Sequence, residues 1–222
     1  MKNILKLTQK KYRREMNLCI VEGEKLVREH RERAVKIYYR KTHGAGAPPH
    51  GEYLDAKTFD ALSSLETSQG VLAIVPIPKS GEVTFPYLVL DGVQDPGNVG
   101  TLLRTAAAFG FKTVFCVNCA DVWSQKVIRA AMGAQFHLNI HSEFTQVPAQ
   151  SILYIADLGA GDFTRPTGKF GLVLGNEGQG PSSAIKSMPH TAVTIATENV
   201  ESLNVAVAGG ILMYKMCNNL VD

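Results

Sequence analysis

Apolar runs alternate with amphipathic segments along the second half of the chain. The run Tyr87–Leu90 is apolar throughout, as expected of a strand in a parallel sheet that is covered on both faces. Strands that alternate with helices predict an α/β domain built on such a sheet. The further predicted strands are residues 112–117, 136–140, 152–156, 170–174 and 192–196, and the predicted helices are residues 96–109, 124–133, 182–188 and 202–217.

The first part of the chain has a shorter and more highly charged pattern. A short strand at Ile20–Val21 precedes a predicted helix at residues 22–32, in which Leu26 and Val27 face inward. The further predicted elements are a strand at 35–39, a loop at 42–51, a helix capped by Asp55 that runs to about residue 65, and a strand at 71–75. This order predicts a second, small α/β layer domain.

Two prolines and a glycine between residues 76 and 82 resist regular structure and indicate a boundary between the two patterns. We therefore expect a small α/β domain at residues 1–78, a linker at 79–86 and the parallel-sheet domain at 87–222.

The composition excludes the disordered, fibrous and membrane-spanning classes. Of the 222 residues, 45% are hydrophobic and 19% are charged, as in globular proteins. No run approaches the ~18 apolar residues of a spanning helix. Lys2 and Lys6 interrupt the N-terminus too often for a secretory signal, and four cysteines do not make a disulfide framework. We expect a cytoplasmic protein.

The net charge of +3 is unevenly distributed along the chain. Residues 1–41 carry 13 Lys and Arg against 5 Asp and Glu, a balance of +8, and the remainder carries 10 against 15, a balance of −5. This asymmetry indicates either a basic surface for a polyanion such as nucleic acid or a well-solvated pair of helices.

The first of three glycine-bearing turns covers residues 91–100. Its glycines at 92, 97 and 100 do not match the G-x-G-x-x-G fingerprint, which disfavours a dinucleotide oxidoreductase. Asn98-Val99 stand where a phosphate-binding P-loop requires Lys-Ser or Lys-Thr. Asn98 and Arg104 remain as candidates. Arg104 is either a cation for phosphate and developing negative charge or a partner in a surface salt bridge.

The other two turns also carry polar side chains. Residues 174–181 place three glycines around Glu177, which indicates either a tight turn or close approach of a ligand. In residues 200–210, Ser202 is a candidate N-cap, and Ser202 and Asn204 are hydrogen-bonding groups at a helix start. The small residues that follow favour a tight helix contact or a dimer interface.

Metal and thiol chemistry find little support in the sequence. Cys116 and Cys119 form a C-x-x-C pair without a second pair, and the six histidines lack zinc-ligand spacing. We therefore expect neither a metal site nor a cysteine nucleophile.

Taken together, the three turns resemble the SpoU (TrmH-like) branch of the SPOUT family, which methylates the ribose 2′-hydroxyl of RNA. The resemblance covers about residues 87–217, and a shorter, collinear one relates the N-terminal part to the family's RNA-binding domain. It is carried by residues 95–100 with Arg104, 127–134, 174–180 and 201–205, and in the N-terminal part by 21–29 and 66–73.

The resemblance implies a fold and an activity. It implies a parallel α/β sheet whose C-terminal segment forms a deep trefoil knot, S-adenosylmethionine bound in that knot, and a homodimer packed through it. The substrate would be ribosomal RNA, preferably of the large subunit, with transfer RNA as the alternative. A non-catalytic RNA-binding protein that kept the fold is the alternative of another class.

The resemblance also implies roles for particular residues. Arg104 would activate the hydroxyl or bind the adjoining phosphate, and Asn98 would orient Arg104 or the ribose. Glu177, Ser202 and Asn204 would shape the catalytic site by hydrogen bonds. The cofactor would contact Leu174, Gly175, Asn176, Ile195 and Leu203, and the basic residues expected to bind RNA are Arg13, Arg14, Lys25 and Arg28.

The sequence departs from the family pattern at a few positions. The family has Ile-Pro-Met ahead of the third motif, where this chain has Ile195-Ala196-Thr197, and Ala206 and Ala131 stand where serine is common. Because all the motif side chains named above are present, we expect an active enzyme.

Overall fold

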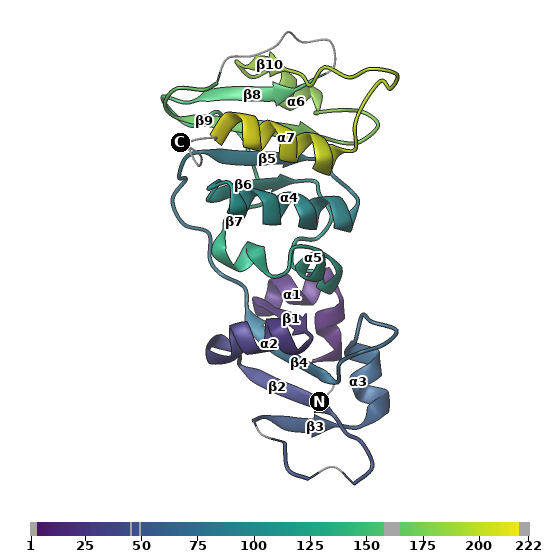
Figure 1. Cartoon of the computed structure of the whole chain (residues 1–222). Helices are drawn as coiled ribbons and strands as arrows, with labels where there is room; N and C mark the ends of the chain where they lie inside the picture. Colours follow the sequence, from purple (N-terminus) through teal and green to yellow (C-terminus); the bar gives the residue numbers. More distant parts are fainter. Residues whose placement is uncertain (1–3, 45, 49, 158–164, 218–222) are drawn as a thin grey trace, which may run out of the picture.

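A computed structural model describes residues 4–44, 46–48, 50–157 and 165–217 and contains two β-sheets, one in each part of the chain (Figure 1). The N-terminal sheet has the order β1-β4-β2-β3, with β4 antiparallel to β1 and β2, and β2 parallel to β3. Its strands are β1 (Leu18–Glu22), β2 (Lys36–Arg40), β3 (Glu52–Leu54) and β4 (Val71–Pro76), and its helices are α1 (Lys10–Met16), α2 (Glu24–His30) and α3 (Ala56–Leu62), with short 3-10 helices at Leu5–Thr8 and Arg31–Arg33.

The second sheet is parallel throughout, as the alternating pattern predicts. Its strand order is β10-β8-β9-β5-β6-β7, so β5 pairs with β9, a strand from much later in the chain. The strands are β5 (Tyr87–Asp91), β6 (Thr113–Val117), β7 (Asn139–His141), β8 (Ile152–Ala156), β9 (Phe170–Gly175) and β10 (Thr191–Val193), and the helices are α4 (Pro96–Ala108), α5 (Gln125–Ala130), α6 (Ser183–Lys186) and α7 (Val205–Cys217).

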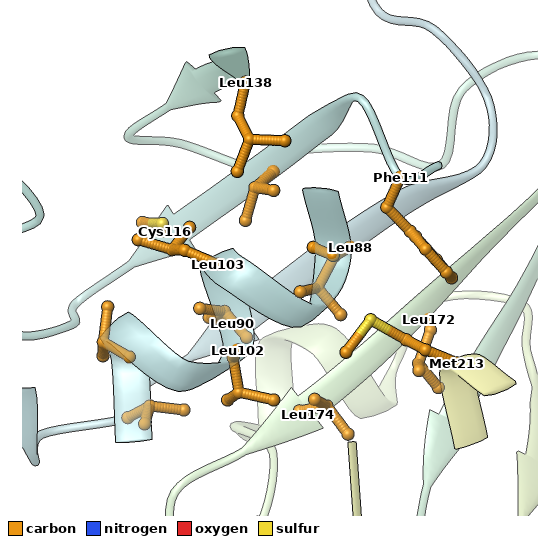
Figure 2. Close-up of a cluster of buried hydrophobic side chains, with 14 of the residues drawn as sticks. Leu88, Leu90, Leu102, Leu103, Phe111, Cys116, Leu138, Leu172, Leu174 and Met213 are labelled. Carbon is orange, nitrogen blue, oxygen red and sulfur yellow. The ribbon is translucent and has the colours of Figure 1, made fainter. Parts of the chain in front are cut away.

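The main core lies between the parallel sheet and the helices α4 and α7, which cover one of its faces side by side (Figure 1). Leu102 and Leu103 of α4 pack with Leu88 and Leu90 of β5, and Met213 of α7 lies beside them (Figure 2). All of these side chains are at most 1% exposed. Each fully buried side chain of this kind stabilises the fold by roughly 2 kcal/mol, so this layer holds the loops at the sheet edge in place.

Helix starts follow from local chemistry. Asp95 accepts a hydrogen bond from the backbone N–H of Asn98 at 2.8 Å, and Pro96 occupies the first helical turn, where no N–H is needed. Asp55 caps α3 in the same way, accepting from the N–H of Thr58 at 2.9 Å. Both helices therefore begin where their caps predict.

The structure corrects several expected boundaries. The strand expected at 136–140 is a 3-10 helix at Ala134–His137 followed by β7, because Gly133 takes φ +78° and turns the chain first. Helix α7 begins at Val205, not at Ser202. The strand β3 has no counterpart in the predicted pattern.

The two sheets are joined by residues 77–86, which contain no helix or strand. The side chains of Ile128 and Phe136, from the second half, pack into the apolar cluster of β1, α2 and β4. Arg129 also donates to the hydroxyl of Ser64 at 2.8 Å. The division at 1–78, 79–86 and 87–222 stays a prediction, but the two halves share a packed contact surface. Among the described residues, no helix is long and apolar enough to cross a membrane.

Candidate functional site

The loops that follow β8, β9 and β10 and the segment before α7 line an open cavity of about 410 Å³ at the carboxyl edge of the parallel sheet. Ligands of α/β proteins bind at this edge because the connecting loops converge there. The cavity is lined by all five residues expected to contact a cofactor, Leu174, Gly175, Asn176, Ile195 and Leu203, and also by Glu177 and Ser202.

The turn after β9 is held in a single shape by Asn176. Its backbone exchanges two hydrogen bonds with Gly180, at 2.9 and 3.1 Å. Its side-chain oxygen accepts from the N–H groups of Gly178 and Gln179, both at 3.0 Å, and its amide donates to the carbonyl of Gly92 at 2.9 Å. The side chain of Asn176 is therefore engaged in the turn, which leaves backbone groups of the turn to line the cavity.

Gly175 is required where β9 enters this turn. A Cβ atom at this position would lie 2.1 Å from the nitrogen of Pro181 and 2.3 Å from the carbonyl carbon of Gly180. Both neighbours are backbone atoms that cannot move aside without opening the turn. The two sides of the turn thus approach so closely that only glycine fits.

A chain of three side chains joins the three glycine-bearing turns. The amide of Asn98 donates to a carboxylate oxygen of Glu177 at 3.0 Å, and the amide of Asn204 donates to the side-chain oxygen of Asn98 at 3.1 Å. Asn204 also caps α7, because its side-chain oxygen accepts from the N–H groups of Ala206 at 2.9 Å and Val207 at 3.3 Å. The expected cap Ser202 lies instead at the cavity wall.

Arg104 lies apart from this chain. It sits in the second half of α4 with an exposed side chain, and it has no hydrogen bond or ion pair with the part of the chain that the structure describes. Asn98 contacts Glu177 and Asn204, so the structure does not bring Asn98 and Arg104 together. The guanidinium is free to meet an anion in solution.

Comparison with known proteins assigns this arrangement to a family. The SpoU rRNA Methylase family matches residues 86–214, which include all three turns. The chain belongs to the SpoU rRNA methylase family. An MRM3-like substrate binding domain matches residues 1–73. These matches confirm the family that the three motifs predict.

Individual relatives of this SpoU methylase cover nearly its whole length. The 23S rRNA (guanosine(2553)-2'-O)-methyltransferase RlmP of Bacillus subtilis is 33% identical over 95% of this chain and 93% of its own. An rRNA methyltransferase from Sinorhizobium meliloti is 26% identical, with a TM-score of 0.83 over 100% of this chain and 95% of its own. A putative RNA methyltransferase of the TrmH family from Porphyromonas gingivalis is 31% identical, with a TM-score of 0.77 over 97% and 95%.

The structure adds cavity residues that the motifs of this SpoU methylase do not reveal. Asp157 and Lys186 form an ion pair at 3.0 Å, and both line the cavity with Thr194 and Thr197. Asp157 directly follows β8, and a polar residue at the carboxyl end of a predicted parallel strand is the signal that could have found it. Asp91, the last residue of β5, accepts from the N–H of Ser182 at 2.6 Å and fixes the start of α6.

Four basic residues are expected to bind RNA, and the structure contradicts this expectation for Arg13. It is 6% exposed, and its guanidinium is ion-paired with Asp121 and donates to the carbonyl of Leu7. It therefore fastens α1 to the second half of the chain and is not available to a ligand. Arg14, Lys25 and Arg28 are exposed.

The cysteines of the C-x-x-C pair are not poised for chemistry. Burial raises the pKa of Cys119 to about 11 and that of Cys116 well above its usual value. The thiol of Cys119 donates to the carbonyl of Leu90 at 3.1 Å. Both sulfurs are thus protonated at neutral pH, whereas nucleophilic attack and metal binding need the thiolate.

Proposed function

We propose that this SpoU methylase transfers the methyl group of S-adenosylmethionine to a ribose 2′-hydroxyl in ribosomal RNA of the large subunit. The observation that carries the chemistry is the meeting of three motif turns at one cavity, linked through Glu177, Asn98 and Asn204. The whole-length similarity to RlmP, which is named for a guanosine of 23S rRNA, supports the substrate.

The cavity fits S-adenosylmethionine in size and in charge. Its volume of about 410 Å³ lies within the range of small-molecule sites. Leu174, Ile195 and Leu203 offer apolar surface for a nucleobase, and the carboxylates of Glu177 and Glu201 favour a cationic group. When bound, the cofactor supplies a methyl group attached to a positively charged sulfur. The sulfur is the leaving group, and because of its positive charge it needs no proton.

The protein then has to act on the hydroxyl. Positioning is the main contribution available, because the nucleophile is weak until it lies close to the methyl group and loses its proton. We assign the orientation of the ribose to Asn98, whose amide is fixed on both sides. Arg104, which stays charged, binds the adjoining phosphate or stabilises the negative charge that develops on the oxygen.

The finer expectations from the family are part of the proposal. We propose that the C-terminal segment forms the family's trefoil knot and that two copies pack through it. Val207 and Tyr214 support this, because both are apolar side chains of α7 that are about half exposed, at 52% and 50%. We also propose a cytoplasmic location, where a ribosomal RNA substrate would be met, and RNA contacts through Arg14, Lys25 and Arg28.

The test is to incubate the purified protein with labelled cofactor and unmodified large-subunit rRNA, and then to map the 2′-O-methylated nucleotide. Transfer to one ribose of that RNA, and loss of the same mark in a deletion strain, are the expected results. Methylation of transfer RNA alone would select the alternative substrate. Calorimetry that detects no binding of S-adenosylmethionine would select the non-catalytic alternative.

A further inference from the structure

A second cleft, of about 590 Å³, lies between helix α1 of the N-terminal half and the loops of the parallel sheet. Its walls are α1, the connecting residues 77–80 and the loops that follow β6 and β7. Both loops begin at the carboxyl edge of the parallel sheet, which also carries the cofactor cavity. They follow β6 and β7, whereas the cavity lies at β8, β9 and β10. The cleft and the proposed reaction site therefore lie along the same edge of the sheet, with β5 between their strands.

The cleft is built by fixed contacts. Asn17, at the end of α1, accepts from the N–H of Ile77 at 2.9 Å and donates through its side chain to the carbonyl of Ile77 at 3.0 Å. At the other end of the segment, the hydroxyl of Ser80 donates to the carbonyl of Ile140. Lys79 is thus held between two anchors in the cleft wall. The buried pair of Arg13 and Asp121 holds α1 against the loop after β6.

The charge of the cleft is positive. Lys10, Arg14 and Lys79 line it with exposed side chains, and none of the three has a hydrogen bond or ion pair with the described residues. The acidic residue in its lining, Asp121, is neutralised by Arg13. Lys10 and Arg14 lie one helical turn apart, so their side chains project from the same face of α1.

An aromatic side chain completes the wall. Trp123 lines the cleft, is half-buried and packs edge-on against Phe136 at 5.3 Å between ring centroids. His141 also lines it, but its ring stacks on Phe115 at 5.0 Å, and burial lowers its pKa. His141 is therefore an uncharged part of the wall, while Trp123 offers the surface on which a base could pack.

We propose that this cleft binds a single-stranded RNA segment that flanks the methylated nucleotide. Lys10, Arg14 and Lys79 contact its phosphodiesters, and Trp123 packs against an unpaired base. Cations that follow a backbone, combined with an aromatic ring, are the usual means of holding single-stranded RNA. The inference rests on the proposed function for the kind of nucleic acid, and it adds a subsite that joins both halves of the chain.

The test compares three single variants, Lys10→Ala, Arg14→Ala and Lys79→Ala, with Lys112→Ala. Lys112 is an exposed lysine just before β6, at the opposite edge of the sheet, which makes it a matched control. Dissociation constants for an in vitro transcript of large-subunit rRNA are measured at several salt concentrations. Each cleft variant should bind about 3- to 10-fold more weakly than the control, with a salt slope smaller by about 0.7 to 1. Affinities and slopes equal to those of Lys112→Ala overturn the proposal.

Two further measurements separate this proposal from the proposed function. The protein has one tryptophan, so its emission reports on Trp123 alone. The transcript should change that emission in the wild type, and the change should need more RNA in Arg14→Ala and Lys79→Ala. Unchanged emission at saturating RNA overturns the cleft site while rRNA methylation stands. A wild type that neither binds nor methylates the transcript overturns both. Cofactor binding at the wild-type level in each variant excludes misfolding as the cause.

Discussion

The side-chain amide of Asn204 donates to the side-chain oxygen of Asn98 at 3.1 Å across 106 residues of sequence. Because Asn98 in turn donates to Glu177, both ends of its amide are assigned and its side chain cannot flip without losing a bond. The hydrogen bond from Asn204 to Asn98 therefore joins the third turn to the first, and the bond from Asn98 to Glu177 joins the first turn to the second. Substitution of Asn98, which does not line the cavity, should therefore affect turnover more than cofactor binding.

Exchange of Asn98 for aspartate should lower turnover by roughly 10- to 100-fold. Asn98→Asp replaces the donor that faces Glu177 with a second carboxylate, which removes a hydrogen bond and adds repulsion worth about 1.5 to 3 kcal/mol. Single-turnover transfer of labelled methyl to rRNA measures the loss, and calorimetry should show little change in cofactor affinity. An Asn98→Asp enzyme with wild-type turnover would remove Asn98 from the site.

Removal of the Arg104 side chain should abolish transfer and leave cofactor binding nearly intact, because Arg104 does not line the cavity. Arg104→Ala is compared with Arg104→Lys, which keeps the charge but loses the planar guanidinium. Labelled cofactor and rRNA measure transfer. Comparable turnover in Arg104→Ala and the wild type would contradict the proposed role of Arg104 in transfer.

A methyl group at position 175 should weaken cofactor binding. In Gly175→Ala the new Cβ meets the backbone of Pro181 at 2.1 Å, so the turn must open. We expect at least a tenfold weaker affinity for S-adenosylmethionine by calorimetry, with a loss of about 1 to 3 kcal/mol in the free energy of unfolding. The matched control is Gly178→Ala in the same turn, whose Cβ would meet only the side-chain oxygen of Asn176, at 3.7 Å. Equal affinities in the two variants would contradict the steric argument.

Loss of the Arg13 guanidinium should destabilise the whole protein. The side chains of Arg13 and Asp121 are 8% and 17% exposed, so Arg13→Ala leaves a poorly solvated carboxylate without its partner. Breaking such a pair lowers the free energy of unfolding by about 3 kcal/mol or more. Urea unfolding measures the change. Arg14→Ala, on the exposed face of the same helix, should stay within about 0.5 kcal/mol of the wild type. A double Arg13→Met, Asp121→Leu variant should recover part of the loss.

Stability should fall as the pH is lowered below about 6.5. His30 is 3% exposed, both its ring nitrogens lack a partner in the described structure, and burial followed by the charge of Arg33 lowers its pKa. The unfolded chain therefore binds a proton at a higher pH than the folded chain does. The favourable contribution of neutral His30 is lost between the unfolded pKa and the lower folded one.

The measurement is the free energy of unfolding at pH 7.5, 6.5 and 5.5 for the wild type, His30→Leu and His43→Leu, the last of which alters an exposed histidine. His30→Leu should reduce the decrease with falling pH, and His43→Leu should not. The pH dependence that persists in His30→Leu includes a contribution from His141, because burial also lowers the pKa of His141. A pH dependence that His30→Leu leaves unchanged would contradict this account.

The parallel sheet could be predicted because each strand carries its own apolar signal. Tyr87–Leu90 is buried from end to end, and Pro96 marks the first turn of the next helix. The candidate site could be placed for a related reason. Turns at the carboxyl ends of parallel strands share one edge, so residues such as Gly175 and Leu203 meet even though no local pattern links them.

Other features depend on contacts between distant segments and leave no local trace. Arg13 belongs to a basic stretch that predicts a solvated surface, yet Asp121, 108 residues later, draws it into a buried pair. Ser202 and Asn204 are both good N-caps for α7. The hydrogen bond from Asn204 to Asn98 favours the start of α7 directly after Asn204. The short strand β3 exists because it pairs with β2, not because of its own sequence.

The pairing of β5 with β9 has a consequence for how the protein is made. The N-terminal sheet uses residues up to 76 and can close early in synthesis. The parallel sheet cannot, because its central pair joins Tyr87 to Gly171. The cofactor cavity also needs Leu212, in the second half of α7, so its walls are complete only after this part of α7 has left the ribosome. A polypeptide truncated before α7 would carry the substrate-binding-like domain without the means to accept a methyl donor.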